Sequence, residues 1–198
     1  MDEPLDPHCQ KQRIRQQALA NRQKQDDKDH FSREICCTLV GLPEYLAART
    51  VLAYVDFRAE VRSRELLASV WRDGKHLAVP YCAGGRLHLF RLASMDELAP
   101  GTWEILEPRH ELRSHVHRHV DVTELDLIVV PGVAFDRCGG RVGYGKGYYD
   151  ALLSRVSPRT AVVGIAFECQ LFPQVPMLDH DVYLHKVITE KAVYTRSE

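Results

Sequence analysis

The sequence predicts an α/β protein, a single-domain, three-layer α/β/α arrangement with a mostly parallel sheet, Rossmann-like in architecture. Strand-like and helix-like segments alternate along the chain, and the runs at 127–130 and 161–166 are continuously apolar. Strands that are apolar on both faces are typical of parallel sheets covered by helices on both sides. The 198 residues suffice for one substantial core. We expect residues 1–7 to form a flexible tail whose prolines oppose helix formation, and residues 8–198 to form one domain.

The first quarter of the chain is expected to contain two helices, at 8–22 and 28–40. The first is markedly basic, and no acidic residue follows its cations until Asp26: Lys11, Arg13, Arg15, Arg22 and Lys24. Lys11 and Arg15 are four residues apart, so they project from one face of the helix. Such a face is most often simply solvated, but two cations on one face could also reach a polyphosphate.

Strands are expected in the middle of the chain at 50–55, 76–80 and 87–92, where apolar and β-branched residues predominate. A helix should connect the first two of these strands, from a Ser63 cap to Trp71. Strand, helix and strand in this order form the unit from which parallel sheets are built.

The segment that follows is expected to be mostly irregular. Ser94 and Glu97 have the spacing of a capping box, which predicts a short helix. A turn then leads to Trp103, and residues 107–123 are expected to be irregular and exposed. Three histidines alternate within this stretch and could face one way on an extended segment: His115, His117 and His119. They lack supporting carboxylate or cysteine ligands, so a solvated loop is a better interpretation than a metal site.

The last third of the chain is expected to supply the centre of the sheet. A strand at 127–130 enters a glycine-rich loop at 132–147, and a helix follows to about residue 155. A strand at 161–166 and two short closing strands, at 187–189 and 192–194, complete the pattern. Ligands of open α/β sheets bind beyond the carboxyl ends of strands, which is where the 132–147 loop falls.

The segment from 126 to 150 has the parts that hold a phosphate. Five glycines lie between Gly139 and Gly147, interleaved with Arg141 and Lys146. Glycine lets the backbone approach an anion closely, backbone N–H groups donate to it, and a helix N-terminus adds partial positive charge. The loop is not a Walker A motif, because Lys146 is followed by glycine, and its glycine spacing is not the G-x-G-x-x-G dinucleotide fingerprint.

Asp150 follows this loop, in the first turn of the expected helix. The helix dipole favours a carboxylate there even without function. As a Mg²⁺ ligand Asp150 would need a second oxygen donor, for which Asp179 and Asp181 are candidates.

Composition limits the kinds of partner and the compartment that we expect for this protein. A formal net charge of −1 gives no general attraction to nucleic acid or an acidic membrane. No apolar run approaches the roughly 20 residues that span a bilayer, and the N-terminal segment lacks the apolar stretch of a secretory signal. The six cysteines contain no C-x-x-C pair, and Cys36-Cys37 should lie on the buried face of the second helix. We expect a cytoplasmic protein with no nucleic-acid or membrane partner.

The loop and several residues outside it carry a family resemblance. The runs PGVAFD at 131–136 and GRVGYGKGYYD at 140–150 are similar to the signature of the 5-formyltetrahydrofolate cyclo-ligase family, also called 5,10-methenyltetrahydrofolate synthetases. Further matches lie along the chain from its N-terminal helix to its end: Lys11, Arg15, Glu60, Trp103, His180-Asp181 and the run 187–190. The resemblance therefore covers the chain from Lys11 onward.

The resemblance implies an ATP- and Mg²⁺-dependent ring closure. 5-Formyltetrahydrofolate would become 5,10-methenyltetrahydrofolate, with release of ADP and phosphate. The formyl oxygen is first phosphorylated by the γ-phosphate of ATP, N10 then attacks the activated carbon, and phosphate departs. Such a phosphoryl transfer asks the protein mainly for positioning and charge neutralisation.

The resemblance also assigns site residues. Lys146 and Arg141 would act in catalysis, and Asp150 and Asp181 would hold Mg²⁺. ATP would be bound by Lys11, Arg15, Arg141, Val142, Gly143, Tyr144, Gly145, Lys146, Gly147, Tyr148 and Tyr149. The folate would be bound by Val55, Glu60, Trp103, Tyr144, Gly145, Lys146, Gly147 and Tyr148. Some members carry arginine at the position of Tyr144, so this chain has one loop cation fewer.

Two other functions stay open at this point. A protein of this fold could bind reduced folate or nucleotide without turnover, although the joint presence of Lys11, Arg15, Lys146 and Asp150 argues against it. A sugar-phosphate or acyl-transfer enzyme would need a general base, for which Glu60 is the candidate. Whichever function holds, we expect the protein to be a monomer.

Overall fold

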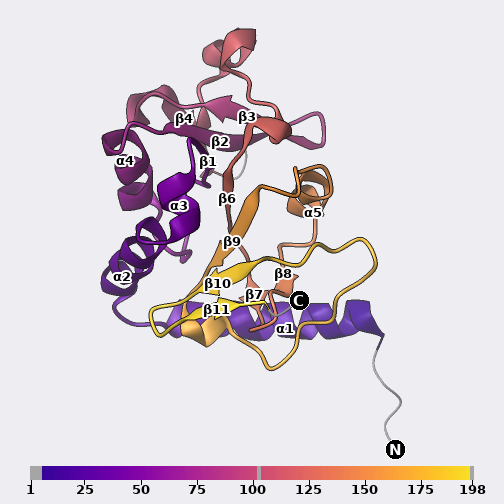
Figure 1. Cartoon of the computed structure of the whole chain (residues 1–198). Coiled ribbons are helices and arrows are strands. Elements are labelled where there is room, and N and C mark those ends of the chain that lie inside the picture. Colours follow the sequence, from indigo (N-terminus) through magenta and orange to yellow (C-terminus); the bar gives the residue numbers. More distant parts are fainter. Residues whose placement is uncertain (1–5, 102–103, 197–198) are drawn as a thin grey trace, which may run out of the picture.

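The centre of the molecule is a seven-stranded, mostly parallel sheet, seen in a computed structural model that describes residues 6–101 and 104–196 (Figure 1). Its strand order is β11-β10-β9-β6-β1-β2-β3. The strands are β1 (Thr50–Leu52), β2 (His76–Ala83), β3 (Arg86–Arg91), β6 (Leu127–Val130), β9 (Ala161–Ile165), β10 (Lys186–Ile188) and β11 (Val193–Thr195). The edge strands β3 and β11 pair antiparallel with their neighbours, and the other pairings are parallel. The predicted α/β fold with a mostly parallel sheet is confirmed.

Helices α2 (Lys28–Val40), α3 (Pro43–Ala47), α4 (Arg64–Arg72) and α5 (Tyr148–Leu153) cover the two faces of this sheet. The remaining α-helix of the described residues, α1 (Pro7–Lys24), lies elsewhere. Successive side chains of a strand point to opposite faces. Accordingly, Leu127 and Val129 of β6 pack with α2, α3 and α4, whereas Ile128 and Val130 pack with α5 and the connecting segments. This two-sided burial is the reason that β6 is apolar throughout.

α1 lies across the carboxyl ends of the parallel strands, not on either face of the sheet (Figure 1). Its Ala18 packs against Val133 and Ala134, directly beyond β6. The helix begins at Pro7, with Asp6 as its N-cap. The expectation that Pro7 prevents a helix is wrong, because the first helical position needs no backbone N–H donor. The tail at 1–5 lies outside the described residues.

The N-terminal half otherwise follows the prediction closely, with three differences. The unpredicted α3 is a single five-residue turn. β2 extends to Ala83, because Gly84-Gly85, both at positive φ, close a hairpin with β3. Ser63 precedes α4, but its hydroxyl does not cap the helix: it donates to Asp56 Oδ1 over 3.2 Å. Of the cysteine pair on α2, Cys36 is buried and Cys37 is exposed.

The predicted capping box after β3 is wrong. The turn is a short 3₁₀ helix, η1 (Met95–Glu97), and Ser94 makes no capping hydrogen bond. Glu97 Oε2 accepts from the Ala93 backbone N–H over 2.8 Å, and Arg118 holds the same carboxylate, its Nη1 and Nη2 each donating over 2.6 Å. A carboxylate engaged by both arms of a guanidinium is a stronger arrangement than a single cap.

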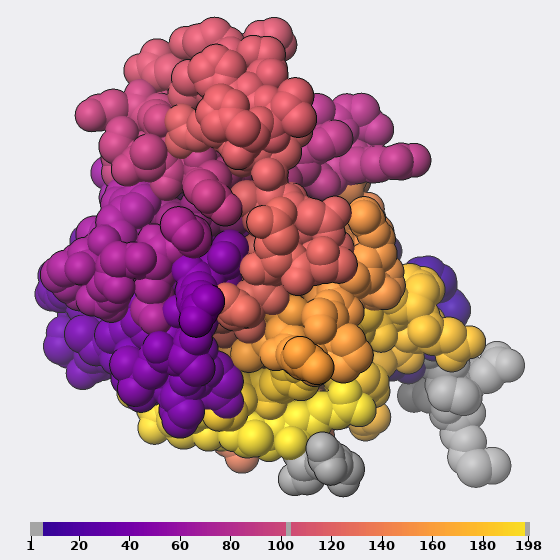
Figure 2. Space-filling model, turned by 45° about the horizontal axis from the view of Figure 1, so that its top comes forward, coloured from indigo at the N-terminus to yellow at the C-terminus, as the bar shows by residue number. Residues whose placement is uncertain are grey.

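The stretch from 107 to 123 is more regular than predicted. β4 (Leu98–Pro100) pairs with β5 (Leu106–Pro108), and three 3₁₀ turns follow: η3 (His110–Ser114), η4 (Val116–Arg118) and η5 (Val122–Glu124). The turns η3 and η4 stand out from the body of the molecule (Figures 1 and 2). Val120 and Val122 are buried, so the end of this stretch belongs to the core.

Part of the glycine-rich segment after β6 forms a β-hairpin. β7 (Ala134–Phe135) and β8 (Arg141–Val142) pair antiparallel. The buried carboxylate of Asp136 accepts from the backbone N–H groups of Cys138 and Gly140, over 2.9 and 2.8 Å, and so closes the turn. The free loop is thereby reduced to residues 143–147. α5 after it has six residues, fewer than predicted.

We expect Gly139→Ala to destabilise the protein far more than Gly85→Ala. Both glycines have positive φ, +85° and +73°, so both substitutions carry the backbone strain of that region. A Cβ at Gly139 would also overlap the Leu184 carbonyl oxygen, whereas one at Gly85 meets nothing within 4 Å. In urea unfolding, Gly85→Ala should cost about 1 kcal/mol and Gly139→Ala at least about 2 kcal/mol more. Equal losses would show that the hairpin does not need this close approach.

Candidate active site

The candidate site lies at the carboxyl edge of the sheet, where the order of strand connection reverses. After β1 the chain moves to β2 on one side, and after β6 it moves to β9 on the other side. β1 and β6 are parallel neighbours, so their carboxyl ends form a topological switch point, where open α/β sheets bind ligands. The segment after β1 carries Val55 and Glu60, and the segment after β6 carries the glycine loop.

These two segments meet through Glu60 and Tyr144. The Tyr144 hydroxyl donates to Glu60 Oε1 over 3.2 Å, and the Phe57 backbone N–H donates to Oε2 over 3.0 Å. On its other side the same hydroxyl accepts from Arg22 Nη2 over 2.7 Å. Arg22, on α1, also donates to the Gly132 carbonyl at the end of β6 over 3.2 Å. The helix, the loop and the predicted folate carboxylate are therefore joined in one hydrogen-bonded chain.

Glu60 is 6% exposed, and its surroundings decide its charge. Burial raises the pKa of Glu60 above its ordinary value. The positive charge of Arg22, the Phe57 N–H and the Tyr144 hydroxyl act in the opposite direction, while Asp56 adds to the rise. Arg22 is thus the principal group that favours the carboxylate form.

The two cations predicted on α1 contact two different loops. Lys11 forms an ion pair with Asp181, whose carboxylate also accepts from the Leu178 N–H over 2.7 Å. Although burial raises the pKa of Asp181, the bonds from Lys11 and Leu178 outweigh it and lower the pKa. Arg15 Nε donates to the Gly143 carbonyl over 2.9 Å. One face of α1 therefore holds both loops.

A second cluster surrounds Arg141. This buried arginine donates from Nη2 to Asp150 Oδ1 over 2.8 Å, and its guanidinium lies 5.7 Å from the centre of the Tyr149 ring. Burial raises the pKa of Tyr149, which keeps its hydroxyl neutral. Among the described residues, neither Arg141 Nε nor the Tyr149 hydroxyl has a hydrogen-bond partner. Buried polar groups are nearly always satisfied, so these two favour an oxygen-rich ligand beside them.

The other predicted residues differ in exposure. Lys146 is exposed at the centre of the loop, and Tyr148, which opens α5, is half-buried. Gly145 and Gly147, on either side of the lysine, both have positive φ. Val55 is buried behind the site. Two positions remain: the Val142 carbonyl accepts from the Val133 N–H over 2.8 Å, and Trp103 lies outside the described residues.

Two carboxylates suit a magnesium ion by their chemistry. Asp150 and Asp181 are hard oxygen donors beside the loop, whereas Asp179 is exposed. Within 6–101 and 104–196, no group of three or more histidine, cysteine or acidic side chains is placed to hold a metal. Mg²⁺ usually takes one or two carboxylates and completes its shell with water and substrate phosphates. By their chemistry these two carboxylates are suitable for Mg²⁺, and the described residues offer no site for a fully protein-bound metal.

The alternating histidines do not all face one way, and all three are exposed, as the preferred interpretation of a solvated loop predicts. His115 and His117 stack with ring centres 5.6 Å apart and are exposed. His119 is engaged elsewhere, through a 2.8 Å hydrogen bond between its Nε2 and the Arg113 carbonyl. The 3₁₀ turns of this segment replace the extended backbone on which the alternation was based.

Arg22 is the residue that sequence reasoning missed. It lies seven residues beyond Arg15 and eleven beyond Lys11. With 3.6 residues per turn, these spacings bring all three side chains to one face of α1. Extending the periodicity by two turns would have identified it.

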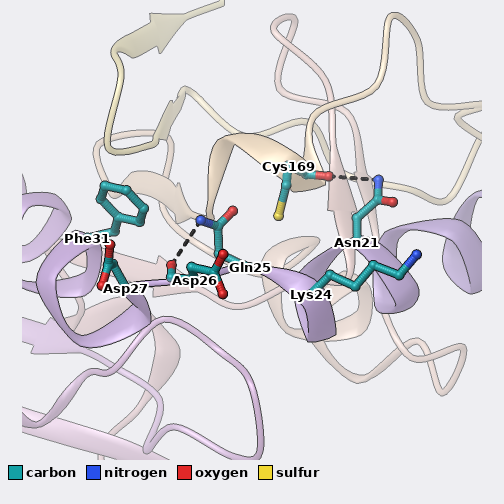
Figure 3. Close-up of a pocket in the computed structure, with 7 residues that line it drawn as sticks. All are labelled: Asn21, Lys24, Gln25, Asp26, Asp27, Phe31 and Cys169. Atoms are coloured by element: carbon teal, nitrogen blue, oxygen red, sulfur yellow. Dashed lines mark hydrogen bonds between the residues drawn. The ribbon is translucent and has the colours of Figure 1, made fainter.

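A separate hollow of about 450 Å³ lies at the corner between α1 and α2 (Figure 3). Its lining consists of Asn21, Lys24, Gln25, Asp26, Asp27, Phe31 and Cys169. Within it, Asn21 Nδ2 donates to the Cys169 carbonyl over 3.1 Å. None of the predicted site residues lines this hollow, so it is distinct from the candidate site.

The chain is similar to known proteins over most of its length. The sequence model of the 5-formyltetrahydrofolate cyclo-ligase family matches residues 7–190. A Schizosaccharomyces pombe protein named probable 5-formyltetrahydrofolate cyclo-ligase is 33% identical, covering 83% of this chain and 86% of its own length. The Escherichia coli K12 5-formyltetrahydrofolate cyclo-ligase is 29% identical, covering 92% and 98%.

The fold has a solved counterpart. The NMR structure of Aquifex aeolicus 5,10-methenyltetrahydrofolate synthetase superposes with a TM-score of 0.81 at 32% identity. The match covers 95% of this chain and 93% of that one. The fold and the sequence signature therefore indicate the same family.

Proposed function

Because the chain belongs to the 5-formyltetrahydrofolate cyclo-ligase family, we propose that it converts 5-formyltetrahydrofolate to 5,10-methenyltetrahydrofolate with ATP and Mg²⁺. The observation that carries this proposal is the meeting, at the switch point, of a phosphate-type loop with the buried Glu60. One part suits a polyphosphate and the other suits the N–H groups of a pterin. Residues 8–198 would act as one catalytic unit.

The proposed reaction has two chemical steps. The formyl oxygen attacks the γ-phosphorus of ATP, and ADP leaves. N10 then attacks the activated formyl carbon and loses its proton, and the carbon–oxygen bond breaks to release phosphate. The first step converts a poor leaving group into a good one. The protein must therefore hold the formyl oxygen and the γ-phosphate in contact and neutralise the charge between them.

The loop residues 141–149 and the α1 cations are proposed to bind ATP. Lys146 is exposed on a glycine-flanked turn, where its ammonium can follow the transferred phosphoryl group. Arg15 already contacts the Gly143 carbonyl, so its charge lies beside the same turn. Lys11 lies one helical turn earlier on the same face. Arg141 is buried, so its proposed catalytic charge acts through its free Nε–H and its partner Asp150.

Asp150 on α5 and Asp181, which pairs with Lys11, are the proposed metal ligands. When bound, Mg²⁺ would neutralise the phosphate oxygens of ATP. Each carboxylate pairs with a cation, Asp150 with Arg141 and Asp181 with Lys11, and each cation orients its carboxylate.

The folate is proposed to bind between Glu60 and the exposed ring of Tyr144. Glu60 would accept from the pterin N–H groups, and the aromatic faces of Tyr144 and Tyr148 would stack on the rings. Val55 supplies a buried apolar wall. Trp103, Gly145, Lys146 and Gly147 complete the proposed set.

The test is absorbance in the band of the methenyl product, with 5-formyltetrahydrofolate and Mg²⁺, with and without ATP. ATP-dependent growth of this band supports the proposal. Folate binding without growth would instead favour a binding protein without turnover. Absence of both growth and binding would favour the sugar-phosphate or acyl-transfer alternative.

The surroundings in which the enzyme works are also proposed. The six cysteines are free, which is consistent with a reducing cytoplasm. No helix in the described part of the chain is long and apolar enough to cross a membrane. The exposed large apolar side chains of the described residues are Leu46, Val116, Tyr144, Tyr183 and Val193. They lie on separate elements, which supports a monomer, and light scattering would measure its mass.

A further inference from the structure

Arg22 lies on the same face of α1 as the two predicted ATP cations but points elsewhere. It is 3% exposed, and it donates hydrogen bonds to the Gly132 carbonyl and the Tyr144 hydroxyl. Burying a guanidinium is costly unless its donors are engaged and its charge is compensated. The position of this residue therefore requires an explanation beyond helix packing.

The Gly132 carbonyl does not supply that explanation. Gln170 Nε2 donates to the same oxygen over 3.1 Å, and to the Val133 carbonyl over 2.9 Å. The carbonyl at the end of β6 is therefore satisfied without Arg22. What depends on Arg22 is the other contact, the Tyr144 hydroxyl, which a guanidinium and a carboxylate share.

The direction of the two hydrogen bonds that link Arg22, Tyr144 and Glu60 is fixed by the chemistry of their groups. A guanidinium can only donate, so the Tyr144 oxygen accepts from Arg22 and its proton must go to Glu60. This leaves Glu60 as the acceptor, which is the role that pterin N–H groups require. The Tyr144 ring is fixed at its hydroxyl and remains 48% exposed, so an aromatic face is presented beside the carboxylate.

We propose that Arg22 is a positioning residue for the folate half of the reaction, acting on substrate through Tyr144 and Glu60. This inference rests on the proposed function. Arg22 holds the loop tyrosine in one orientation and keeps the buried carboxylate ionised, so that the N–H groups of a reduced pterin meet an acceptor. Arg22 itself touches neither substrate.

The effect on pH dependence follows from the groups around Glu60. Those that bear on its charge are Arg22, Asp56 and Tyr144, together with Tyr54 and Tyr149, whose own pKa values are raised in part by Glu60. Burial already raises the pKa of Glu60, and Arg22 is the first of the groups that oppose this. Removing Arg22 raises that pKa further. Folate binding that needs the carboxylate is then lost at a higher pH than in the wild type.

The test is equilibrium binding and steady-state kinetics of Arg22→Met across pH 5.5–8.5, values chosen to bracket roughly neutral pH. We expect KM for 5-formyltetrahydrofolate to rise by about tenfold, KM for ATP to change by less than about threefold, and the acid limb of folate binding to move to higher pH. Arg22→Lys should restore the acid limb in part, because it keeps the charge. Arg13→Met, on an exposed position of the same helix, should match the wild type.

A second variant keeps the inference falsifiable if Arg22→Met fails to fold. Tyr144→Phe keeps the ring and removes the link, so it should raise KM for folate while Arg22 is still present. In the double variant with Arg22→Lys, the two effects should be strongly non-additive. Additive effects, an unmoved acid limb, or equal rises in both KM values would overturn the positioning role.

Wild-type behaviour separates the two ideas. If the wild type neither binds 5-formyltetrahydrofolate nor forms the methenyl product, the proposed function fails. If the wild type does both and the Arg22 variants match it, the function stands and the positioning role fails.

Discussion

Replacing Lys146 with alanine is expected to lower kcat by about 100-fold, the loss typical of removing one preorganised group from a developing charge. The lysine is exposed on the 143–147 turn, so its removal leaves no buried group unpaired. The melting temperature should therefore be unchanged. The measurement is the ATP-dependent rate of methenyl formation at saturating substrates, beside a thermal melt.

Two variants show whether this loss is specific. Lys191→Ala removes another exposed lysine, far along the chain on the turn before β11, and should leave kcat unaltered. Lys146→Arg keeps the charge and should retain more activity than alanine. A folded Lys146→Ala protein with a near-normal rate would remove this residue from the phosphate site.

Replacing Asp150 with asparagine is expected to raise the Mg²⁺ concentration for half-maximal rate by at least about tenfold. The change removes a proposed ligand charge. It also removes the counter-ion of the buried Arg141, which should lower the free energy of unfolding by about 1–3 kcal/mol. The measurements are a Mg²⁺ titration of the rate and urea unfolding without metal.

These two effects can be separated. Arg141→Met breaks the same ion pair but leaves the carboxylate, so its stability should fall while its Mg²⁺ requirement changes less. If Asp150→Asn titrates like the wild type, Asp150 has a structural role with Arg141 and is not a metal ligand.

The centre of the fold could be predicted because its residues are buried on both sides. The apolar runs of β6 and β9 leave no alternative to a covered parallel sheet, and both were placed within a residue. The failures lie where side chains choose between local and distant partners. Glu97 accepts locally from the Ala93 N–H, but it also binds Arg118, twenty-one residues further on. Sequence spacing predicts the local hydrogen bond but gives no information about the distant partner.

The candidate site shows the same division. The glycine loop and the pair Lys11 and Arg15 could be predicted as phosphate-binding groups because the spacing of their residues indicates this role. Spacing also places Arg22 on the face of Lys11 and Arg15, but its role could not be predicted from spacing, since that role depends on Tyr144 and Glu60, which are distant in sequence. The pairing of Arg141 with Asp150 is also a tertiary result, because the helix that carries Asp150 must first pack over the hairpin.

The attachment of α1 has a consequence for motion. Ala18 and Arg22 are its buried residues, and several of its anchors are polar: Lys11 to Asp181, Arg15 to Gly143 and Arg22 to Tyr144. Its apolar contacts come mainly from Ala18 and the partly buried Ile14 and Leu19, so α1 should open locally at a lower free energy than the sheet does. Its amide hydrogens should therefore exchange with solvent ahead of those of β6. Ligands that tighten the loops at 143–147 and 181 would slow that exchange along the whole helix. The rate of amide exchange along α1 would therefore report whether substrate is bound.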